Sequence, residues 1–448
     1  MLTIREADTA DWTDQPGSFL FQVAAASESS GDFTTIKSIR VVCKAWLLVA
    51  NSSRRTWHPQ YGCTSDRVRT LARNFPSLTT VDLSSCLPRA PVDLGPLLHL
   101  KSLQTFHAGN YALCIPSGSS QALGQLTNLV YLDLCPLGNL SLLQLSQLQQ
   151  LRILSVRGPE VYTSPGGPDC YENETAAQHI LQQAASLTQL QSISLSRLAL
   201  NEDAWEVLTE LTQLQSLSLT EVIHTAYVQQ TSRKPEEHLN SQASEAAFGA
   251  VCDLEQLAEL VMPESLVYLT HIRSICGLSL LTKLNIQGIQ NVRSLEGIEH
   301  AARLEYFNMA DVICVSTLAP LQQLTKLREL HFPRCINVQT WGVQAISLLK
   351  RLEVIDMHCC AFSSTWITLL TGLQHLGNLD MSVGNWRDQD IVQLTTCASL
   401  SVLGLRDCPS TTSSMHRILK ERLPLLKRIE AECSTSGDQY AGFLGWPY

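Results

Sequence analysis

Side chains of the types that bind metals or transfer protons recur at nearly equal intervals in the C-terminal half of the chain. They are His331, Asp356, His358 and Asp380, and positions 331, 356 and 380 are 25 and 24 residues apart. Imidazole and carboxylate groups brought together in this way could ligate a metal ion or perform acid–base catalysis. The alternative, which we favour, is a polar surface exposed to solvent, because any regular repeat brings residues at this spacing together.

No sequence motif supports a catalytic centre. The chain lacks the phosphate-binding loop, the glycine-rich dinucleotide-binding turn, the zinc-protease helix motif and the serine-hydrolase elbow. Its fifteen cysteines include no Cys-x-x-Cys pair and no zinc-type spacing with histidine. We therefore predict a protein that is not an enzyme and that has no catalytic, cofactor or metal site.

The elements that position these residues are repeats of the pattern L-x-x-L-x-x-L-x-L, seen most clearly at 211–219 and 324–332. Most copies follow one another at 22–26 residues, which is the period of leucine-rich repeats. The pattern predicts an α/β solenoid (horseshoe) of about fourteen repeats over residues 61–434, each with a short strand and a return helix. The predicted strand centres are Val81, Phe106, Leu132, Leu154, Ile193, Leu217, Leu260, Leu284, Phe307, Leu330, Ile355, Leu379, Leu403 and Ile429.

Side chains on a strand alternate between two faces, so the residues on either side of each buried centre should lie on an exposed parallel sheet. One repeat cannot bury its apolar face alone, and stacking gives a long surface suited to a large partner. Aromatic and arginine side chains are the usual energetic centres of such contacts. The predicted partner-binding residues are Tyr131, Tyr306, Asn308, His331, Asp356, His358, Asp380 and Arg406.

Two intervals are long because they carry polar insertions at 157–178 and 221–247, rich in turn-forming residues. Their composition predicts loops or partly disordered segments. Insertions of repeat proteins often line the binding face, so they could form a rim around a partner, although tolerated surface decoration is the alternative. Residues 435–448 are predicted to form a tail that covers the end of the core, and residues 1–14 a loose leader.

Composition restricts the partners and the compartment. The net charge is −9, the isoelectric point is near 5.7 and no basic run occurs, which argues against nucleic acid and anionic membranes. The first residues lack the apolar region of a secretion signal, and no apolar stretch approaches 18 residues. We expect a cytoplasmic or nuclear protein whose cysteines are reduced.

Residues 15–60 differ in pattern from the repeats and predict a small helical domain, with apolar residues at three- and four-residue steps between Ile36 and Ala50. Its residues resemble an F-box, the helical module that docks on the Skp-type adaptor of cullin-based ubiquitin ligases. The resemblance rests on Pro16, Leu20 and Val23, on the run R-V-V-C-K-A-W at 40–46, and on Trp57 as the closing tryptophan. It implies that Pro16, Leu20 and Val23 contact the adaptor.

The repeats resemble the cysteine-containing subclass found behind F-boxes, because cysteine follows the strand at Cys86, Cys335, Cys360 and Cys408. We expect these thiols to satisfy backbone groups in the turn while packing inside. The two resemblances together imply a substrate-recognition subunit of a cullin-type (SCF) ubiquitin ligase, a monomer within a complex with the adaptor, cullin and a protein target. The alternative is a non-catalytic scaffold or adaptor, cytoskeletal or axonemal for example, whose helical head is only a cap. Three departures from the F-box pattern favour that alternative: Gln15 and Ser27 stand where the family usually has leucine, and the loop from Asp32 to Cys43 is about two or three residues longer than is usual.

Overall fold

The computed structural model describes residues 54–59, 63–84, 92–108, 117–134, 144–158, 168–224, 237–360 and 364–431. The predictions for the leader, for Pro16, Leu20 and Val23, for Cys86 and for the C-terminal tail lie outside these ranges. The chain divides into two compact units. Unit 1 comprises residues 1–163 and 175–193, and unit 2 comprises residues 164–174 and 194–448.

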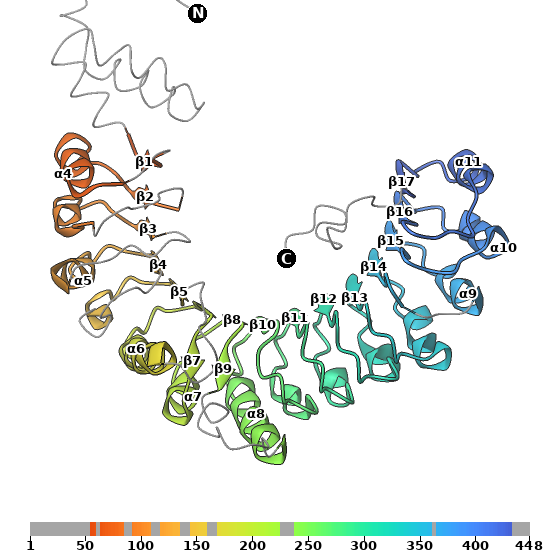
Figure 1. Cartoon of the computed structure of the whole chain (residues 1–448), viewed down its shortest axis with the longest axis horizontal. Coiled ribbons are helices and arrows are strands. Elements are labelled where there is room, and N and C mark those ends of the chain that lie inside the picture. Colours follow the sequence, from red (N-terminus) through yellow and green to blue (C-terminus); the bar gives the residue numbers. More distant parts are fainter. Residues whose placement is uncertain are drawn as a thin grey trace, which may run out of the picture. The chain divides into compact units, whose positions relative to one another are not determined.

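Unit 1 contains a ladder of parallel strands that pair in chain order (Figure 1). Its helical segments return the chain from one strand to the next. The strands are β1 (Thr56–Trp57), β2 (Thr80–Asp82), β3 (Thr105–His107), β4 (Tyr131–Leu134) and β5 (Ile153–Arg157), and the helical segments are α4 (Ser65–Asn74), η3 (Gly95–His99), α5 (Ser117–Gly124) and η5 (Leu145–Gln147). The division between the units cuts α6 (Pro168–Ala184) and β6 (Ser192–Ser196).

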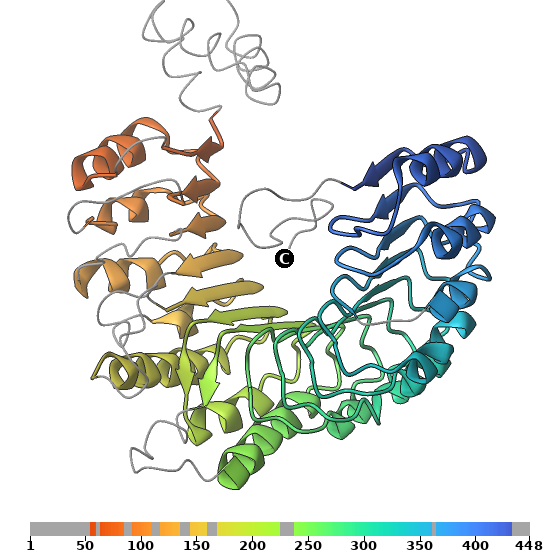
Figure 2. The ribbon, with the colours of Figure 1, turned by 45° about the vertical axis from the view of Figure 1, so that its right-hand side comes forward.

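Unit 2 contains the longer ladder, again parallel and in chain order. Its strands line the concave side of this unit and its helical segments the convex side (Figures 1 and 2). The strands are β8 (Ser216–Thr220), β10 (Glu259–Val261), β11 (Lys283–Asn285), β12 (Tyr306–Asn308), β13 (Glu329–His331), β14 (Val354–Asp356), β15 (Asn378–Asp380), β16 (Val402–Gly404) and β17 (Arg428–Glu430). The helical segments are α7 (Glu202–Thr209), α8 (Glu237–Cys252), η7 (Arg273–Gly277), η8 (Ile298–His300), η9 (Ala319–Gln323), η10 (Thr340–Leu348), η11 (Ser364–Trp366), α9 (Ile367–Leu370), α10 (Asp388–Ile391), η12 (Val392–Thr396) and α11 (Ser413–Arg422).

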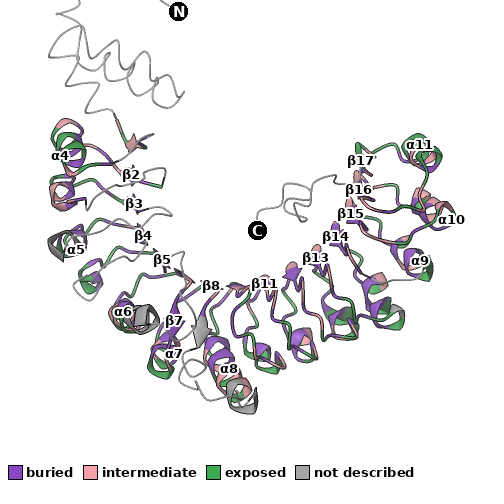
Figure 3. Ribbon diagram, viewed as in Figure 1, coloured by how far each residue is buried: buried purple, intermediate pink, exposed green. Residues whose placement is uncertain are grey.

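All fourteen predicted strand centres lie in strands, and all of them except the last, Ile429, are buried. Leu217, Leu284, Leu330 and Leu403 are each 0% exposed. Figure 3 shows the buried residues gathered between strands and helical segments, with exposed residues on the outer side of the helices. The strand pattern was therefore predicted in the correct register. No described helix is long and apolar enough to cross a membrane.

The two insertions differ from the predicted loops. Part of the first forms α6, which buries Ala177, Ile180, Leu181 and Ala184 at helical spacing. Part of the second forms α8, and Ile223–His224 forms β9, which pairs with β7 (Ala199–Leu200) in a small parallel sheet. The loop prediction was wrong at these residues because downstream apolar residues supply a buried helix face; residues 159–167 and 225–236 lie outside the described ranges.

The start of the sheet also differs from the predicted domain boundary. Trp57, expected to close the helical head, lies in β1 opposite Val81 of β2. The parallel ladder therefore begins before residue 61, and Thr56 and Trp57 extend it by one strand ahead of the first predicted repeat.

A left-handed residue turns the chain after each ladder strand of unit 2 from β8 to β16. Positive φ angles recur at Glu221, Glu264, Gly288, Asp311, Arg334, Cys359, Val383 and Asp407. A single left-handed residue makes a sharp bend that ends the strand. Just beyond this bend the thiols of Cys335 and Cys360 donate to the carbonyl oxygens of Met309 and Phe332, at 3.1 and 3.2 Å. Both thiols are buried, so the expected structural role of these cysteines is confirmed.

Candidate functional site

The polar residues singled out by their spacing do meet on neighbouring strands of unit 2. Asn308 ends β12, His331 ends β13, Asp356 ends β14 and Asp380 ends β15. The register pairs each of them with the next, and Asp380 with Gly404 of β16. Their predicted proximity is therefore confirmed, and we call His331, Asp356, His358 and Asp380 the His–Asp network.

The prediction that these side chains are exposed is wrong. Asn308, His331, Asp356, His358 and Asp380 are only 4, 6, 7, 4 and 1% exposed. Asn308 and Asp380 fold back on their own turns and accept hydrogen bonds at 2.9 Å from the backbone N–H groups of Ala310 and Ser382. Such turns hold the short polar side chain against the backbone, and the neighbouring strands lie only ~4.8 Å away on each side.

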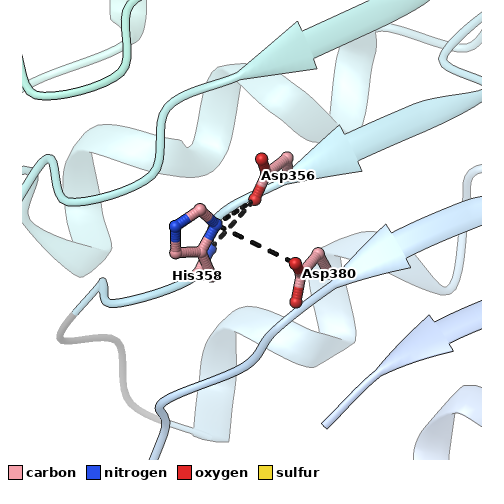
Figure 4. Close-up of side chains that lie close together, drawn as sticks. All are labelled: Asp356, His358 and Asp380. Carbon is pink, nitrogen blue, oxygen red and sulfur yellow. Dashed lines mark hydrogen bonds and ion pairs between the residues drawn. The ribbon is translucent and has the colours of Figure 1, made fainter. Parts of the chain in front are cut away.

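Within the network, Asp356 lies between two imidazoles. His358 Nδ1 is 2.8 Å from Asp356 Oδ1, and His331 Nδ1 is 3.8 Å from Asp356 Oδ2. Asp380 approaches the same imidazole nitrogen, with its Oδ2 3.8 Å from His358 Nδ1 (Figure 4). Glu329 approaches His331 Nε2 at 3.8 Å from the same strand. Carboxylates and imidazoles thus alternate from β13 to β15.

The network sets the protonation of its members. Burial opposes the charged form of His331 and His358, but interactions with Asp356 and neighbouring carboxylates outweigh it and raise the pKa of both. Burial also opposes ionisation of Asp356, yet hydrogen bonds from both imidazoles lower its pKa. Burial and the charge of Asp356 raise the pKa of Asp380 to about 7. Burial and the charge of Asp356 therefore bring the pKa of Asp380, among these groups, near neutral pH.

Tyr306 and Arg406 remain partly exposed on the same surface, as predicted. The Lys283 ammonium lies 5.3 Å from the centre of the Tyr306 ring, and the ring of His331 lies 5.2 Å from it. Arg406 Nη2 pairs with Glu430 Oε2 at 2.8 Å, and the Arg406 side chain is 38% exposed. These contacts hold both side chains in place while leaving part of each accessible to a partner.

Three residues that contact the predicted site residues were not themselves predicted as part of the site. Glu329 contacts His331, Ser382 Oγ accepts from the backbone N–H of Arg406 at 3.1 Å, and buried Glu430 pairs with Arg406. Glu329 and Glu430 lie on strands whose positions were predicted. Their negative charge beside a histidine or an arginine could therefore have indicated these contacts from the sequence. Nothing in the sequence pointed to Ser382.

Unit 1 carries a second polar cluster, which we call the Arg–Asp cluster. Asp133, at 3% exposure, pairs with Arg157 Nη2 at 2.6 Å, and His107 Nδ1 lies 4.0 Å away. The predicted residue Tyr131 is partly exposed beside it, with its ring 4.4 Å from that of His107. Asp82, at the end of β2, has its Oδ2 2.9 Å from Nδ1 of His58, which directly follows β1. The sequence analysis predicted Tyr131 as a partner-binding residue but did not identify this cluster.

Comparison with known proteins supports the fold. No protein-family model matches the chain, and no curated protein matches its sequence. A chain of the mouse RP105/MD-1 complex is 14% identical, with a TM-score of 0.50 over 87% of this chain and 69% of that one. A Listeria monocytogenes internalin is 16% identical, with a TM-score of 0.48 over 76% and 83% of the two chains. A leucine-rich-repeat protein of Leptospira interrogans is also 16% identical, with a TM-score of 0.42 over 86% and 98%. The parallel ladders and the repeat period, together with the mouse structure, identify the fold as a leucine-rich-repeat solenoid.

Proposed function

We propose that this chain is a non-catalytic, protein-binding subunit whose strand surface in unit 2 holds a partner protein. The observation that carries the proposal is the group of partly exposed Tyr306, Lys283, Glu329 and Arg406 around the buried His–Asp network. Tyrosine and arginine supply most of the binding energy in protein interfaces when they are surrounded by other contacts. A surface whose anchors are already held by neighbours loses little conformational entropy on binding.

The buried network supports this surface without belonging to it. His331 packs beside the Tyr306 ring. Only 6% of His331 is exposed, so its side chain cannot form a large contact with a partner protein. We therefore assign the direct contacts to Tyr306 and Arg406 and a supporting role to Asn308, His331, Asp356, His358 and Asp380. Tyr131 is the corresponding anchor of unit 1.

The test is a comparison of variants after the partner has been identified by affinity purification. Changing both Tyr306 and Arg406 to alanine should weaken binding by at least ~2 kcal/mol. Trp341→Ala is the matched control, because Trp341 is 62% exposed in η10, a helical segment rather than a strand. Equal loss in the double variant and the control, or loss only in the control, would reject the strand surface as the binding site.

We further propose that the partner is a target for ubiquitination and that residues 15–60 dock the Skp-type adaptor and, through it, the cullin. Support comes from the resemblance of Pro16, Leu20, Val23 and residues 40–46 to an F-box. The mechanism is proximity, because the subunit raises the concentration of target near the ubiquitin-loaded enzyme. Leu20→Asp should remove adaptor binding and leave target binding intact, since it puts a charge into an apolar contact.

The second candidate is a scaffold without ubiquitin-ligase activity, and the position of β1 favours it. Trp57 lies opposite Val81 of β2, so Thr56–Trp57, inside the predicted head, belong to the sheet, as expected of a cap. The two candidates separate in one measurement of the purified full chain with the adaptor. If the wild-type chain does not bind the adaptor at micromolar concentration while the strand surface still binds its partner, the scaffold is correct.

A further inference from the structure

Asp356, His358 and Asp380 have the geometry of metal ligands. Each offers one ligand atom, and these atoms lie within 4.8 Å of one another (Figure 4). Ligands of one zinc ion lie ~2.0–2.2 Å from it, which places them roughly 3.4 Å apart in a tetrahedral arrangement. Side-chain shifts of less than about 1 Å would bring the three atoms around one ion. The ends of β14 and β15 supply the carboxylates, and the turn after β14 supplies the imidazole.

An unsatisfied oxygen points into this group. Asp380 is 1% exposed, and its Oδ1 accepts from the backbone N–H of Ser382. Its Oδ2 is buried without a hydrogen-bond partner and lies 3.8 Å from His358 Nδ1. A buried carboxylate oxygen without a donor is costly, so this position favours a bound cation or a proton.

Charge balance also favours a divalent cation. In the metal-bound form, with the imidazole neutral and both carboxylates ionised, the three side chains would carry two negative charges in a buried site. The nearby Arg334 guanidinium is engaged in an ion pair with Asp311. A divalent ion would neutralise both carboxylates at once, and the burial that penalises them would then strengthen their attraction to it.

The ligand types favour one class of metal. Imidazole nitrogen suits zinc and its first-row neighbours, whereas calcium and magnesium prefer sites made only of oxygen. Three protein ligands leave a coordination position for water or a partner's side chain. His331 Nδ1, 3.8 Å from Asp356 Oδ2, is placed to orient that carboxylate from outside the ligand set.

We propose that Asp356, His358 and Asp380 bind a divalent first-row transition ion such as Zn²⁺ and that this ion ties β14 to β15 beneath the partner-binding surface. His358 Nδ1 gives up any proton it shares with Asp356 Oδ1 and donates its lone pair to the ion. Binding therefore releases protons and competes with them. The site does not depend on the identity of the partner.

The test uses the full-length chain stripped of metal with a chelator and returned to chelator-free buffer. Zn²⁺ alone is titrated by calorimetry at pH 7.5, and Co²⁺ is added separately to observe visible absorption from its coordination. The wild-type chain should bind one equivalent that Asp380→Asn weakens by more than ~10-fold, with loss of the Co²⁺ absorption. Asparagine preserves the acceptor for Ser382, so the turn should remain folded.

Asp82→Asn is the matched control. Asp82 ends β2 at the equivalent repeat position, accepts from the backbone N–H of Ser84 at 2.8 Å and lies beside a histidine. It should leave Zn²⁺ affinity unchanged. His358→Gln is the second ligand variant, measured in place of Asp380→Asn if circular dichroism shows that Asp380→Asn is misfolded. Wild-type affinity in a folded ligand variant, or equal weakening by the Asp82 control, would overturn the proposal.

Discussion

The two polar clusters occupy equivalent strand ends of the repeat but neutralise their buried carboxylates differently. In the Arg–Asp cluster of unit 1, Asp133 pairs with Arg157, whose charge is permanent. In the His–Asp network of unit 2, Asp356 lies between His331 and His358, whose charges depend on pH. One framework therefore carries a fixed ion pair in one region and a titratable network in the other.

This difference shows what the repeat specifies and what it leaves free. The apolar positions repeat in both units, and so does the turn hydrogen bond of the strand-end residue: Asp82 accepts it in unit 1 and Asp380 in unit 2. The side chains that face this residue from the next strand are not fixed by the repeat. They decide whether the carboxylate has an arginine, a histidine or another carboxylate as its neighbour.

The largest expected loss of stability follows from replacing a buried strand-centre leucine, and it should be the same in units 1 and 2. Leu154 and Leu330 are strand centres with 0% exposure in units 1 and 2. Replacing either with alanine should cost ~2–5 kcal/mol, because the surrounding core closes the cavity only partly. Local unfolding is measured by hydrogen exchange of the neighbouring strands, and exposed Lys326→Ala is the control, at less than ~0.5 kcal/mol. If the losses of stability for the two leucine variants differ by more than the width of the ~2–5 kcal/mol range, the apolar cores of the two units are not equivalent.

The next largest loss of stability, caused by removing the Arg157 charge, should be confined to unit 1. Arg157→Ala leaves buried Asp133 without its main cation, and breaking a fully buried pair costs ~3–5 kcal/mol. Because the Arg157 side chain is 30% exposed, we expect a smaller loss of ~2 kcal/mol in the stability of β4 and β5. Arg157→Lys should recover part of it by keeping the charge. Because the arginine charge is permanent, similar losses at pH 6 and 8 are expected, and a loss that differs clearly between the two pH values would contradict the assignment of the neutralising charge to Arg157.

The third expected effect is a loss of stability with rising pH that should be confined to unit 2. The folded-state pKa values of His331 and His358 are raised, and that of Asp380 is raised to about 7. Groups with raised pKa values stabilise the fold below their unfolded pKa and lose that contribution as pH rises through the folded value. Asp356, whose pKa is lowered, contributes throughout this range. We therefore expect the metal-free protein to lose at least ~1 kcal/mol in β13–β15 between pH 6 and 8.

Hydrogen exchange corrected for the intrinsic effect of pH on exchange rates measures this loss. The strands β3–β5 of unit 1 serve as the internal control, in the same sample and with a chelator present. A decrease of equal size in both sets of strands would assign the effect to the whole chain instead of the His–Asp network.

The sequence was sufficient to predict the strands and the proximity of the network residues. Leucines at fixed spacing can be buried only if each repeat stacks on the next, so strand centres such as Leu217 and Leu284 followed from the period alone. His331, Asp356 and Asp380 then had to lie on consecutive strands, because each sits one residue after such a centre.

Burial at the strand ends and the helices of the insertions could not be predicted in the same way. Alternation places Asp380 on the open face, but the hydrogen bond that it accepts from the Ser382 N–H and its burial arise only after folding. The helix α6 starts within a Pro- and Gly-rich segment, and its apolar residues from Ala177 onward are recognisable only once the core has a place for them. Local composition was outweighed by tertiary burial in both cases.

The smallest expected changes in stability come from replacing a strand-end aspartate with asparagine, and they should have opposite signs in the two units. Asn285 and Asn308 occupy the same repeat position as Asp380 and make the same turn hydrogen bond, at 2.9 Å each. Asp380→Asn therefore keeps the turn and removes a buried charge beside Asp356. At pH 8 without metal it should stabilise β15 by up to ~1 kcal/mol, because Asp380 with its raised pKa is then ionised at a cost. Asp380→Ala removes the acceptor as well and should be ~1 kcal/mol less stable than Asp380→Asn.

Asp82→Asn is the corresponding change in unit 1, and its sign should be opposite. Burial raises the pKa of Asp82, but hydrogen bonds from Ser84 and His58 outweigh that effect and lower it, so the ionised form stabilises the fold at neutral pH. Because His58 is 57% exposed, the loss on removing the charge should stay within ~0.5 kcal/mol. Hydrogen exchange of β2 and β15 in the two variants measures both signs at pH 8. If both variants stabilise, or both destabilise, the strand-end carboxylates are equivalent and the contrast between the clusters does not hold.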